Sequence, residues 1–556
     1  MSLTSIINIA KSGVLAHQTA IAATAENVAN IATPDFARRD VQFQADQIPG
    51  QFSGVSVSVV REASDAALQA ASLSSASDVA GLERVADALS RVLDSLGGTD
   101  DNVSFADRAA QAVNGFAQLN ASPQSAAAQA NALSTLQSAF AAFDETRAVI
   151  DTEVQRAQSG LQSGVDSANT ILQEIATLNA RIASDRDGSG GPADALSAQL
   201  AALSTLLPIN VSRDDIGRAS VVTQSGRVLV DAGGAGQLSA SADGALSLTP
   251  SAGGDPIDIS AEITGGDIGG SLQLVNGDLA AVRDLINQAE AGFANALNAA
   301  AAANTAFPPP AILSGTQALT AAGLSRLEGQ TSIALVNSAG ALSAQIVIDF
   351  TNGTLSRDGG PAIAFGDDPA SLVDGLNAAL GGQGTASLVD GQLVLDGGAL
   401  GGVAIADDGA GFGALAGFNP LLVSDGEGFA VNPDILANPS TIPSARLSLE
   451  GVTLGESVLL ANNGAGAAAL FEAGRGEAEQ LAQTLGTIGA AANASRARAD
   501  SAAAFADDIA ARLASESGVN LEEELTNLIL FQRSFNANAR ILAVADELYQ
   551  SILALI

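Results

Sequence analysis

The sequence of 556 residues contains no cysteine and no tryptophan, and histidine, lysine and tyrosine each occur once, as His17, Lys11 and Tyr549. Without cysteine the chain can form no disulfide, no thiolate metal centre and no thiol nucleophile. One histidine cannot supply a multi-histidine metal site. The only lysine follows Ala10, so the Gly-Lys-Ser/Thr of a phosphate-binding loop is absent. These absences argue against an enzyme, a bound metal and a cofactor.

Positive charge is also scarce. The chain has 24 basic against 60 acidic residues, which gives a net charge of −36. Such a surface repels phosphates and anionic lipid heads, so nucleic acid and membrane surfaces are poor partners. No run approaches the roughly 18 apolar residues of a membrane span, and the first nine residues lack the basic start of a signal peptide. We therefore expect no membrane insertion and no cleaved signal peptide.

Both ends of the chain carry apolar residues at a seven-residue spacing, which is typical of helices that pack in coiled coils. The positions spaced by seven are Ile7, Val14, Ile21 and Val28 in the N-terminal stripe and Leu521, Leu528, Phe535, Leu542 and Tyr549 in the C-terminal stripe. Leu3 lies on the adjoining seam of the first stripe, and Leu525 widens the second; both are counted with the predicted interface. Thr33-Pro34 is expected to end the first helix, and Asn520 to cap the second. The stripes fit an intramolecular helical core and a surface for other subunits equally well.

The middle of the chain alternates between helical and strand-like patterns. After Pro308-Pro309-Pro310 a β-rich segment begins, and residues 312–425 contain eleven acidic residues and two arginines. The Gly-rich stretch 409–417 is interpreted as a second boundary. The predicted elements are helices at 82–96, 161–182, 279–297, 369–380 and from about 477 onward, a hairpin of 220–223 with 227–230, and strands at 332–336, 344–350 and 393–395.

These patterns predict a multidomain protein that is mainly α at its paired termini, with an α+β inner domain and a β-rich outer insertion. The expected domains are a terminal coiled-coil assembly domain (1–60 and 500–556), a helical rod-like inner domain with small β-hairpins (61–311 and 426–499), and an acidic outer domain (312–425).

Three motifs have possible chemical roles but fit simpler explanations. Asp185–Gly190 resembles the start of a calcium loop, but its twelfth position is Leu196, so we interpret it as a polar turn. Glu522–Glu524 fit the first turn of a helix better than a pair of catalytic carboxylates. His17 is expected to be a partly buried, hydrogen-bonded residue at a helix contact.

Residues at both ends resemble the signatures of bacterial flagellar axial proteins, the family of rod, hook and hook-associated proteins. The similar N-terminal positions are Ser12-Gly13, Ala16, Gln18, Ile21, Asn27-Val28-Ala29-Asn30, Thr33-Pro34 and Arg38. The similar C-terminal positions are 518–524, Asn527-Leu528, Phe531-Gln532, Phe535, 537–540 and 545–548. The chain departs from the family pattern at Glu26, Asp35 and Phe36, where Asn, Gly and Tyr are usual.

Within this family the chain is most similar to the hook-associated proteins of the hook–filament junction, through weaker likenesses at 170–182, 265–305 and 429–439. The resemblance implies an extracellular structural protein of the flagellum, exported by the flagellar type III route. It also implies partners, namely copies of itself in a helical ring, the hook protein, the adjacent junction protein on the filament side and an export chaperone. The two apolar stripes would pair and form the assembly interface.

Two alternatives stay open at this point. A sibling axial protein of the hook or distal rod would share the terminal motifs but lack the coiled-coil pattern at 161–182. A secreted calcium-dependent binding or adhesive protein would explain the negative charge and the Asp185–Gly190 segment, and it predicts a calcium-induced gain in stability.

Overall fold

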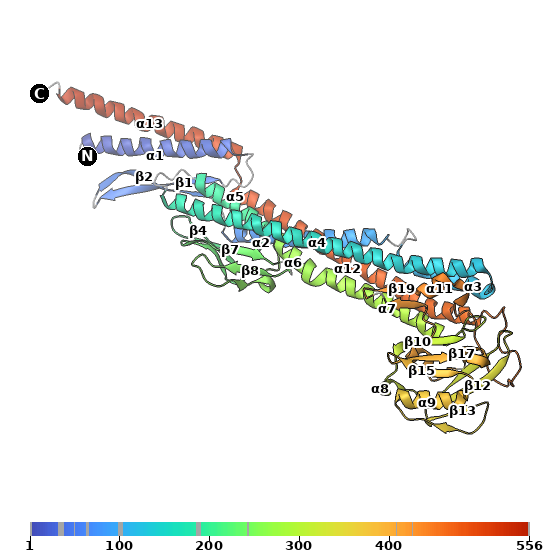
Figure 1. Ribbon diagram of the computed structural model, residues 1–556. Helices are drawn as coiled ribbons and strands as arrows, with labels where there is room; N and C mark the ends of the chain where they lie inside the picture. Colours follow the sequence, from blue (N-terminus) through green and yellow to red (C-terminus); the bar gives the residue numbers. More distant parts are fainter. Residues whose placement is uncertain are drawn as a thin grey trace. The chain divides into compact units, whose positions relative to one another are not determined.

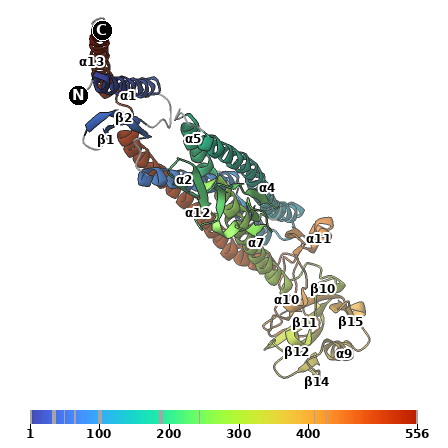
Figure 2. The same cartoon turned by 90° about the vertical axis from the view of Figure 1, so that its left-hand side faces the viewer.

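The fold was analysed in a computed structural model that describes residues 3–31, 38–48, 51–62, 66–97, 104–184, 191–241, 244–406, 408–424 and 426–553 (Figures 1 and 2). The chain divides into two compact units. The first comprises Met1–Ala88, Gln155–Gly277 and Ala494–Ile556, and the second Leu89–Val154 and Asp278–Asn493. Three helices contribute residues to both units: α2 (Ala66–Ser95), α4 (Ala126–Ser184) and α12 (Ala465–Ser517).

The first unit combines long helices with small antiparallel sheets. Its other helices are α1 (Leu3–Ala29), α5 (Gly191–Leu206), α6 (Gly266–Gln273) and α13 (Leu521–Leu553). Its strands are β1 (Arg39–Ile48) and β2 (Gln51–Glu62), which form a hairpin; β3 (Ile209–Arg213), β4 (Ala219–Thr223), β5 (Val228–Asp231) and β6 (Gly234–Ala235); and β7 (Gln237–Ala240), β8 (Leu246–Thr249) and β9 (Ile257–Asp258). A 3₁₀ turn (Ser260–Glu262) precedes α6, and a π-helical turn (Leu274–Asp278) follows it.

The core of the first unit lies between α4 and the two small sheets. Leu161, Leu172 and Ile175 of α4 are buried against the inward residues of the strands. Two asparagines of α4 fix these sheets to the helix. The Asn179 amide donates to the carbonyl of Ala219 at 2.8 Å, and the Ala219 N–H donates back to Asn179 Oδ1 at 2.9 Å. Asn169 is bonded to Leu238 in the same way. We call this reciprocal pairing of a helical asparagine with the backbone of one residue an amide clamp.

The second unit contains a helical part and a β-rich part. The helical part holds α3 (Phe105–Ala121), α7 (Leu279–Ala302) and α11 (Pro433–Ala437) with the shared segments of α4 and α12. Phe140 of α4 stacks on Phe293 of α7, with ring centroids 5.8 Å apart. Glu290 and Arg147 form an ion pair in this core, and the backbone N–H of Phe429 donates to Glu290 Oε1 at 3.1 Å.

The β-rich part is built around a five-stranded antiparallel sheet in the order β14-β13-β12-β11-β17. Its elements are β10 (Ile312–Ala318), α8 (Ala321–Leu324), β11 (Gln330–Val336), β12 (Leu342–Asp349), β13 (Thr354–Arg357), β14 (Ile363–Ala364), α9 (Pro369–Leu380), β15 (Thr385–Val389), β16 (Gln392–Asp396), a 3₁₀ turn (Gly398–Leu400), β17 (Gly402–Ala406), α10 (Phe412–Ala416), β18 (Leu422–Ser424), β19 (Phe429–Val431) and a second 3₁₀ turn (Pro439–Thr441). One core contains α9, β16 and the inner face of the sheet. A second core joins the sheet to apolar residues between Ala445 and Leu459.

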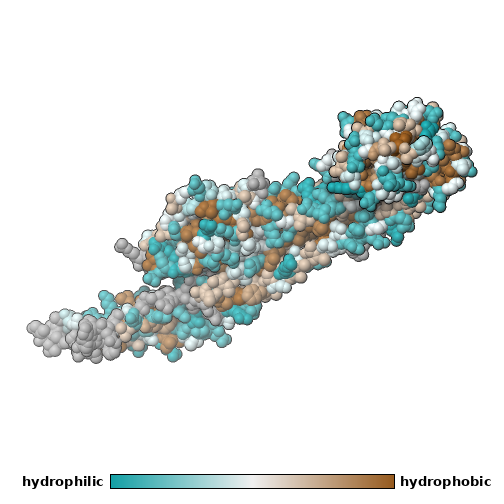
Figure 3. All heavy atoms as spheres, turned by 90° about the horizontal axis from the view of Figure 1, so that it is seen from below, coloured by the Kyte–Doolittle hydropathy of each residue, from teal (hydrophilic) through white to brown (hydrophobic). Residues whose placement is uncertain are grey.

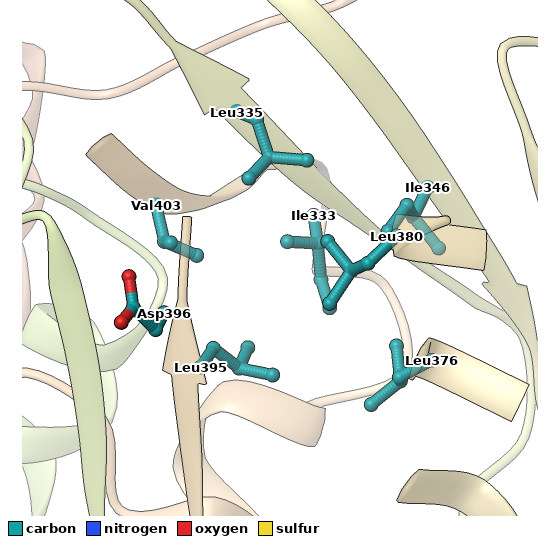
Figure 4. Close-up of a pocket in the computed structure, with 8 residues that line it drawn as sticks. All are labelled: Ile333, Leu335, Ile346, Leu376, Leu380, Leu395, Asp396 and Val403. Carbon is teal, nitrogen blue, oxygen red and sulfur yellow. The ribbon is translucent and has the colours of Figure 1, made fainter. Parts of the chain in front are cut away.

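A narrow gap remains inside the first of these cores (Figure 4). It lies between the sheet, α9 and β16, and its lining is aliphatic except for Asp396. Its accessible volume is about 10 Å³, which is room for one water molecule at most. The gap is therefore a packing defect rather than a ligand pocket.

Most predicted elements are confirmed, and several limits are corrected. The hairpin of β4 and β5 and helix α9 lie where the sequence predicts them. The helix expected at 161–182 begins much earlier, at Ala126, and the one expected from about 477 begins at Ala465. The stretch 409–417, which the sequence suggests as a boundary, contains α10 and buries Phe412 in the core. Helix α1 ends at Ala29, and Thr33-Pro34 lies outside the described residues.

Candidate assembly interface

Helices α1 and α13 lie side by side in the first unit and run in opposite directions (Figure 1). Gly13 of α1 faces Asn538, and Asn27 faces Glu524. A Cβ atom added to Gly13 would lie 2.8 Å from Cγ of Asn538, so only glycine allows this approach without movement of the asparagine. The buried face of α1 consists of small and polar residues: Ala10, Gly13, Ala16, Ala20, Ala23, Thr24 and Asn27.

The predicted interface residues fall into three places around this contact. Leu3, Ile7, Val14, Ile21 and Val28 are half-buried on α1, beside its fully buried stripe. Leu528, Phe535 and Leu542 are half-buried on the face of α13 that also carries Glu524 and Asn538. Leu521, Leu525 and Tyr549 are 44–49% exposed. The predicted stripes thus surround the contact of the two helices, whereas small residues form its centre.

A second apolar row on α13 escaped the sequence analysis. Leu530, Ile541, Val544 and Leu548 are 47–56% exposed, and we call these four residues the outer row. With Ser534 and Ala537 they follow the alternating spacing of four and three residues that defines a coiled-coil seam. The row lies on the side of α13 opposite to Glu524 and Leu528. Its spacing is readable in the sequence, but the larger residues of the first stripe conceal it.

The hairpin of β1 and β2 packs against α1. Ser12 Oγ accepts a hydrogen bond from the Val55 N–H at 3.1 Å. The rings of His17, Phe43 of β1 and Phe531 of α13 form a cluster, with centroids 5.2 and 6.2 Å from His17 to the two phenylalanines and 5.8 Å between the phenylalanines. The Nδ1 atom of His17 is buried without a hydrogen-bond partner, contrary to the prediction of a hydrogen-bonded histidine. Burial lowers the pKa of His17, because it penalises the charged imidazolium.

The start of β1 is held by polar groups from both helices. The Asn27 side chain forms an amide clamp with Arg39 and donates a further bond to Glu524 Oε2 at 3.1 Å. Arg38 lies 2.8 Å from the other oxygen of Glu524 and 2.7 Å from Glu523. The hydrogen bond from Arg38 lowers the pKa of the Glu523 carboxyl. Asn520 caps α13 as predicted, since its Oδ1 accepts the N–H of Glu522 at 3.0 Å.

Glu522–Glu524 therefore do more than the predicted capping, because two of the three carboxylates pair with Arg38. Asp185–Gly190 lies outside the described residues. Within the described ranges no group of three or more His, Cys, Asp or Glu side chains is placed to hold a metal ion. No helix in the same ranges combines the length and the apolar character that a membrane crossing requires.

Comparisons with known proteins add matches to two family profiles and to solved structures. Residues 89–307 match the helical domain of the flagellar hook-associated protein FlgK, and residues 513–555 match the C-terminal domain of the flagellar basal body rod proteins FlgE, FlgF and FlgG. The solved structure of the flagellar hook junction protein FlgK from Burkholderia pseudomallei is 15% identical, with a TM-score of 0.48 over 80% of this chain and 99% of that one. No curated protein gives a significant match.

The two profile matches lie on different parts of the molecule and agree with each other. The first covers α3, α7 and much of the helical part of both units, and the second covers α13. The chain is therefore similar to the hook-associated protein FlgK over residues 89–307 and to the C-terminal domain of the flagellar rod proteins over residues 513–555, which supports the predicted resemblance to a flagellar hook-associated protein.

Proposed function

We propose that this structural protein forms the junction between the flagellar hook and filament, and that its copies join through α1 and α13. The exposed apolar surface of α13 is the observation that carries the proposal. Eight large apolar side chains of this helix are 44–56% exposed: Leu521, Leu525, Ile529, Leu530, Ile541, Val544, Leu548 and Tyr549. On the face drawn in Figure 3, by contrast, hydrophobic residues lie in small patches separated by hydrophilic ones.

A neighbouring copy of the chain is the occupant that best fits this surface. Complete burial of a leucine or isoleucine side chain contributes about 1.5–3 kcal/mol, so covering the outer row favours association strongly. A contiguous apolar strip of this size on a free surface is otherwise an aggregation hazard. The seam spacing of the outer row suits another helix. Head-to-tail contacts of this kind build rings or helical assemblies, as the junction requires.

The remaining parts of the proposal concern partners, route and domains. We propose contacts with the hook protein below and with the adjacent hook-associated junction protein on the filament side. We also propose export with the help of a chaperone by the flagellar type III route, without a cleaved signal peptide, to the extracellular flagellum. No catalytic role is proposed. We also propose the domains predicted from the sequence, and the closed core between Leu313 and Phe418 supports an outward module at 312–425.

A charge in the outer row tests the assembly surface. Val544→Asp should abolish self-association of the purified chain, measured by sedimentation, while its melting temperature changes little, because Val544 is 55% exposed. Ile216→Asp is the matched control, since Ile216 is equally exposed but lies in the turn before β4. Unchanged association of Val544→Asp would contradict the assignment of this surface.

Deletion of the gene in its motile host tests the junction role itself. We expect intact hooks without filaments, and flagellin released into the medium. The wild-type gene and the Ile216→Asp variant should restore filaments, and Val544→Asp should not. Loss of the hooks would instead make the chain a rod or hook component, and normal filaments would refute the proposal.

A further inference from the structure

Asn27 is the most completely bonded buried side chain at the terminal helices. It is 0% exposed, and its amide group forms three hydrogen bonds, two with the backbone of Arg39 and one with α13. One amide N–H goes to the Arg39 carbonyl at 3.1 Å and the other to Glu524 Oε2 at 3.1 Å, while Oδ1 accepts the Arg39 N–H at 2.9 Å. A single amide thus connects α1, β1 and α13.

Similar amide clamps elsewhere in the described chain join a helical asparagine to backbone atoms alone. Asn169 and Asn179 bind Leu238 and Ala219, and Asn377 of α9 binds Ala386 at 2.9 and 2.8 Å. Asn298 of α7 accepts the backbone N–H groups of Leu421 and Leu422 at its Oδ1 atom, and its amide donates to the Leu422 carbonyl. Each of these four joins a helix to neighbouring backbone within one unit. Of the five, Asn27 alone also donates to a charged side chain of a third element.

We propose that Asn27 is a positioning residue that couples the order of the β1–β2 hairpin to the docking of α13. A two-stranded hairpin is marginally stable alone and depends on what its face contacts. When α13 is displaced, Glu524 leaves Asn27, and the Asn27 amide loses one of the three hydrogen bonds that fix its orientation. The two bonds of the clamp are then less firmly held, which loosens the start of β1. By reciprocity, loss of the clamp weakens the docking of α13. The inference does not depend on the proposed function.

The coupling passes through Glu524 and not through its neighbour, which supplies a matched control. Both Glu523 and Glu524 pair with Arg38, but only Glu524 bonds to Asn27. Backbone hydrogen exchange of the full-length chain measures the effect. Glu524→Ala should accelerate exchange across 39–48 and 51–57 by tenfold or more, because hydrogen bonds to charged groups contribute about 1.5–3 kcal/mol. Glu523→Ala should change it by less than about threefold.

A double-mutant cycle separates coupling from a general loss of structure. In an Asn27→Ala background, Glu524→Ala should add less than about threefold to hairpin exchange, and Asn27→Ala alone should accelerate exchange at 524–531. Amides of β11 should keep their wild-type protection in every variant, which shows that the rest of the chain is folded. Equal hairpin exchange in Glu524→Ala and Glu523→Ala would overturn the proposal. So would an unprotected hairpin in the wild-type chain, or a Glu524→Ala effect that is undiminished without Asn27.

Discussion

The β-rich insertion and the terminal helices treat their apolar residues in opposite ways. Between residues 312 and 424 only Ile312 and Val389 are large, apolar and exposed among the described residues, and most of the buried ones lie in the two cores of this region. On α13 eight such side chains are exposed, and Ala545 is the one apolar residue that is fully buried within the described part of the helix. The insertion is complete as a folding unit within one chain. On the terminal helices only one of the two apolar faces is covered within the chain. An exposed apolar face of this kind is expected where one molecule binds another.

The largest difference in the free energy of unfolding is expected when a leucine is replaced by alanine in each of the two regions. Leu393→Ala, in the core of the insertion, should lower the free energy of unfolding by about 2–5 kcal/mol, because Leu393 is 0% exposed and leaves a cavity. Leu530→Ala, in the outer row, should change it by less than about 0.5 kcal/mol, because Leu530 is 56% exposed. Calorimetry of the two variants measures both values. Similar losses in the two variants would mean that α13 is buried within the single chain.

Ion pairs should show a similar contrast, with a smaller effect, between the helical part of the second unit and the terminal helices. Glu290 and Arg147 are 2% and 7% exposed, so Glu290→Ala leaves a buried guanidinium without this carboxylate, while the pair with Asp144 remains. The expected loss is about 3 kcal/mol in chemical denaturation. Burial is the main influence on Glu290 and raises its pKa, which Arg147 partly offsets. Glu523→Ala at the terminal helices should have a much smaller effect, since its pair with Arg38 is open to solvent. The reverse order would refute this contrast.

The close approach of α1 and α13 predicts that one methyl group added at Gly13 destabilises the helix pair. Gly13→Ala should destabilise the helix pair by about 1–3 kcal/mol, since the new Cβ meets the Asn538 amide at 2.8 Å. Asn538→Ala in the same chain should recover part of the loss. Gly486→Ala is the control, because Gly486 lies in α12 with no atom near its Cβ position, and it should stabilise the chain by about 0.5–1 kcal/mol. Hydrogen exchange of α1 and α12 reports the three variants. Equal responses at Gly13 and Gly486 would disprove the close contact.

The smallest expected effect is a dependence on pH at the terminal helices. Burial lowers the pKa of His17 in the folded chain, so the unfolded chain binds a proton at higher pH than the folded one. Stability of the α1–α13 contact should therefore be complete above the usual histidine pKa of about 6.5 and decline as the pH falls below it. His17→Phe should remove this part of the dependence, measured as the difference in melting temperature between pH 7.5 and 5.5. An identical slope in wild type and variant would exclude a contribution from His17.

The sequence could predict elements whose large apolar residues recur at a regular spacing. Helix α9, with Asp368 as its cap and Gly381 after its end, and the alternating strand β12 are examples. The first half of α4 and the start of α12 could not be found in this way. They are rich in alanine, which favours helix but gives little contrast between buried and exposed positions. Similarly, the small residues at the centre of the α1–α13 contact produce no periodic signal. The apolar stripes predicted from their large neighbours therefore surround the contact and do not form its centre.

The polar contacts between α1, β1 and α13 could not be predicted from the sequence for a different reason. Asn27 and Arg38 belong to the motif that resembles the axial family, but nothing in their spacing reveals that they meet Glu524. Such contacts arise only when the chain brings together residues that are remote in sequence. The outer row, in contrast, was readable, because its spacing of four and three residues is continuous from Leu530 to Leu548.

The bond between Asn27 and Glu524 joins positions 497 residues apart, and this distance sets an order of events in folding. Closing a flexible loop of that length costs about 5.5 kcal/mol in chain entropy before any constant is added, against about 2 kcal/mol for a ten-residue loop. Local helices and hairpins of the inner segments form without this cost, and each one shortens the effective loop. The terminal pair is therefore the last part of the chain to form. A chain that emerges with its N-terminus first keeps α1 without its partner until α13 has also emerged.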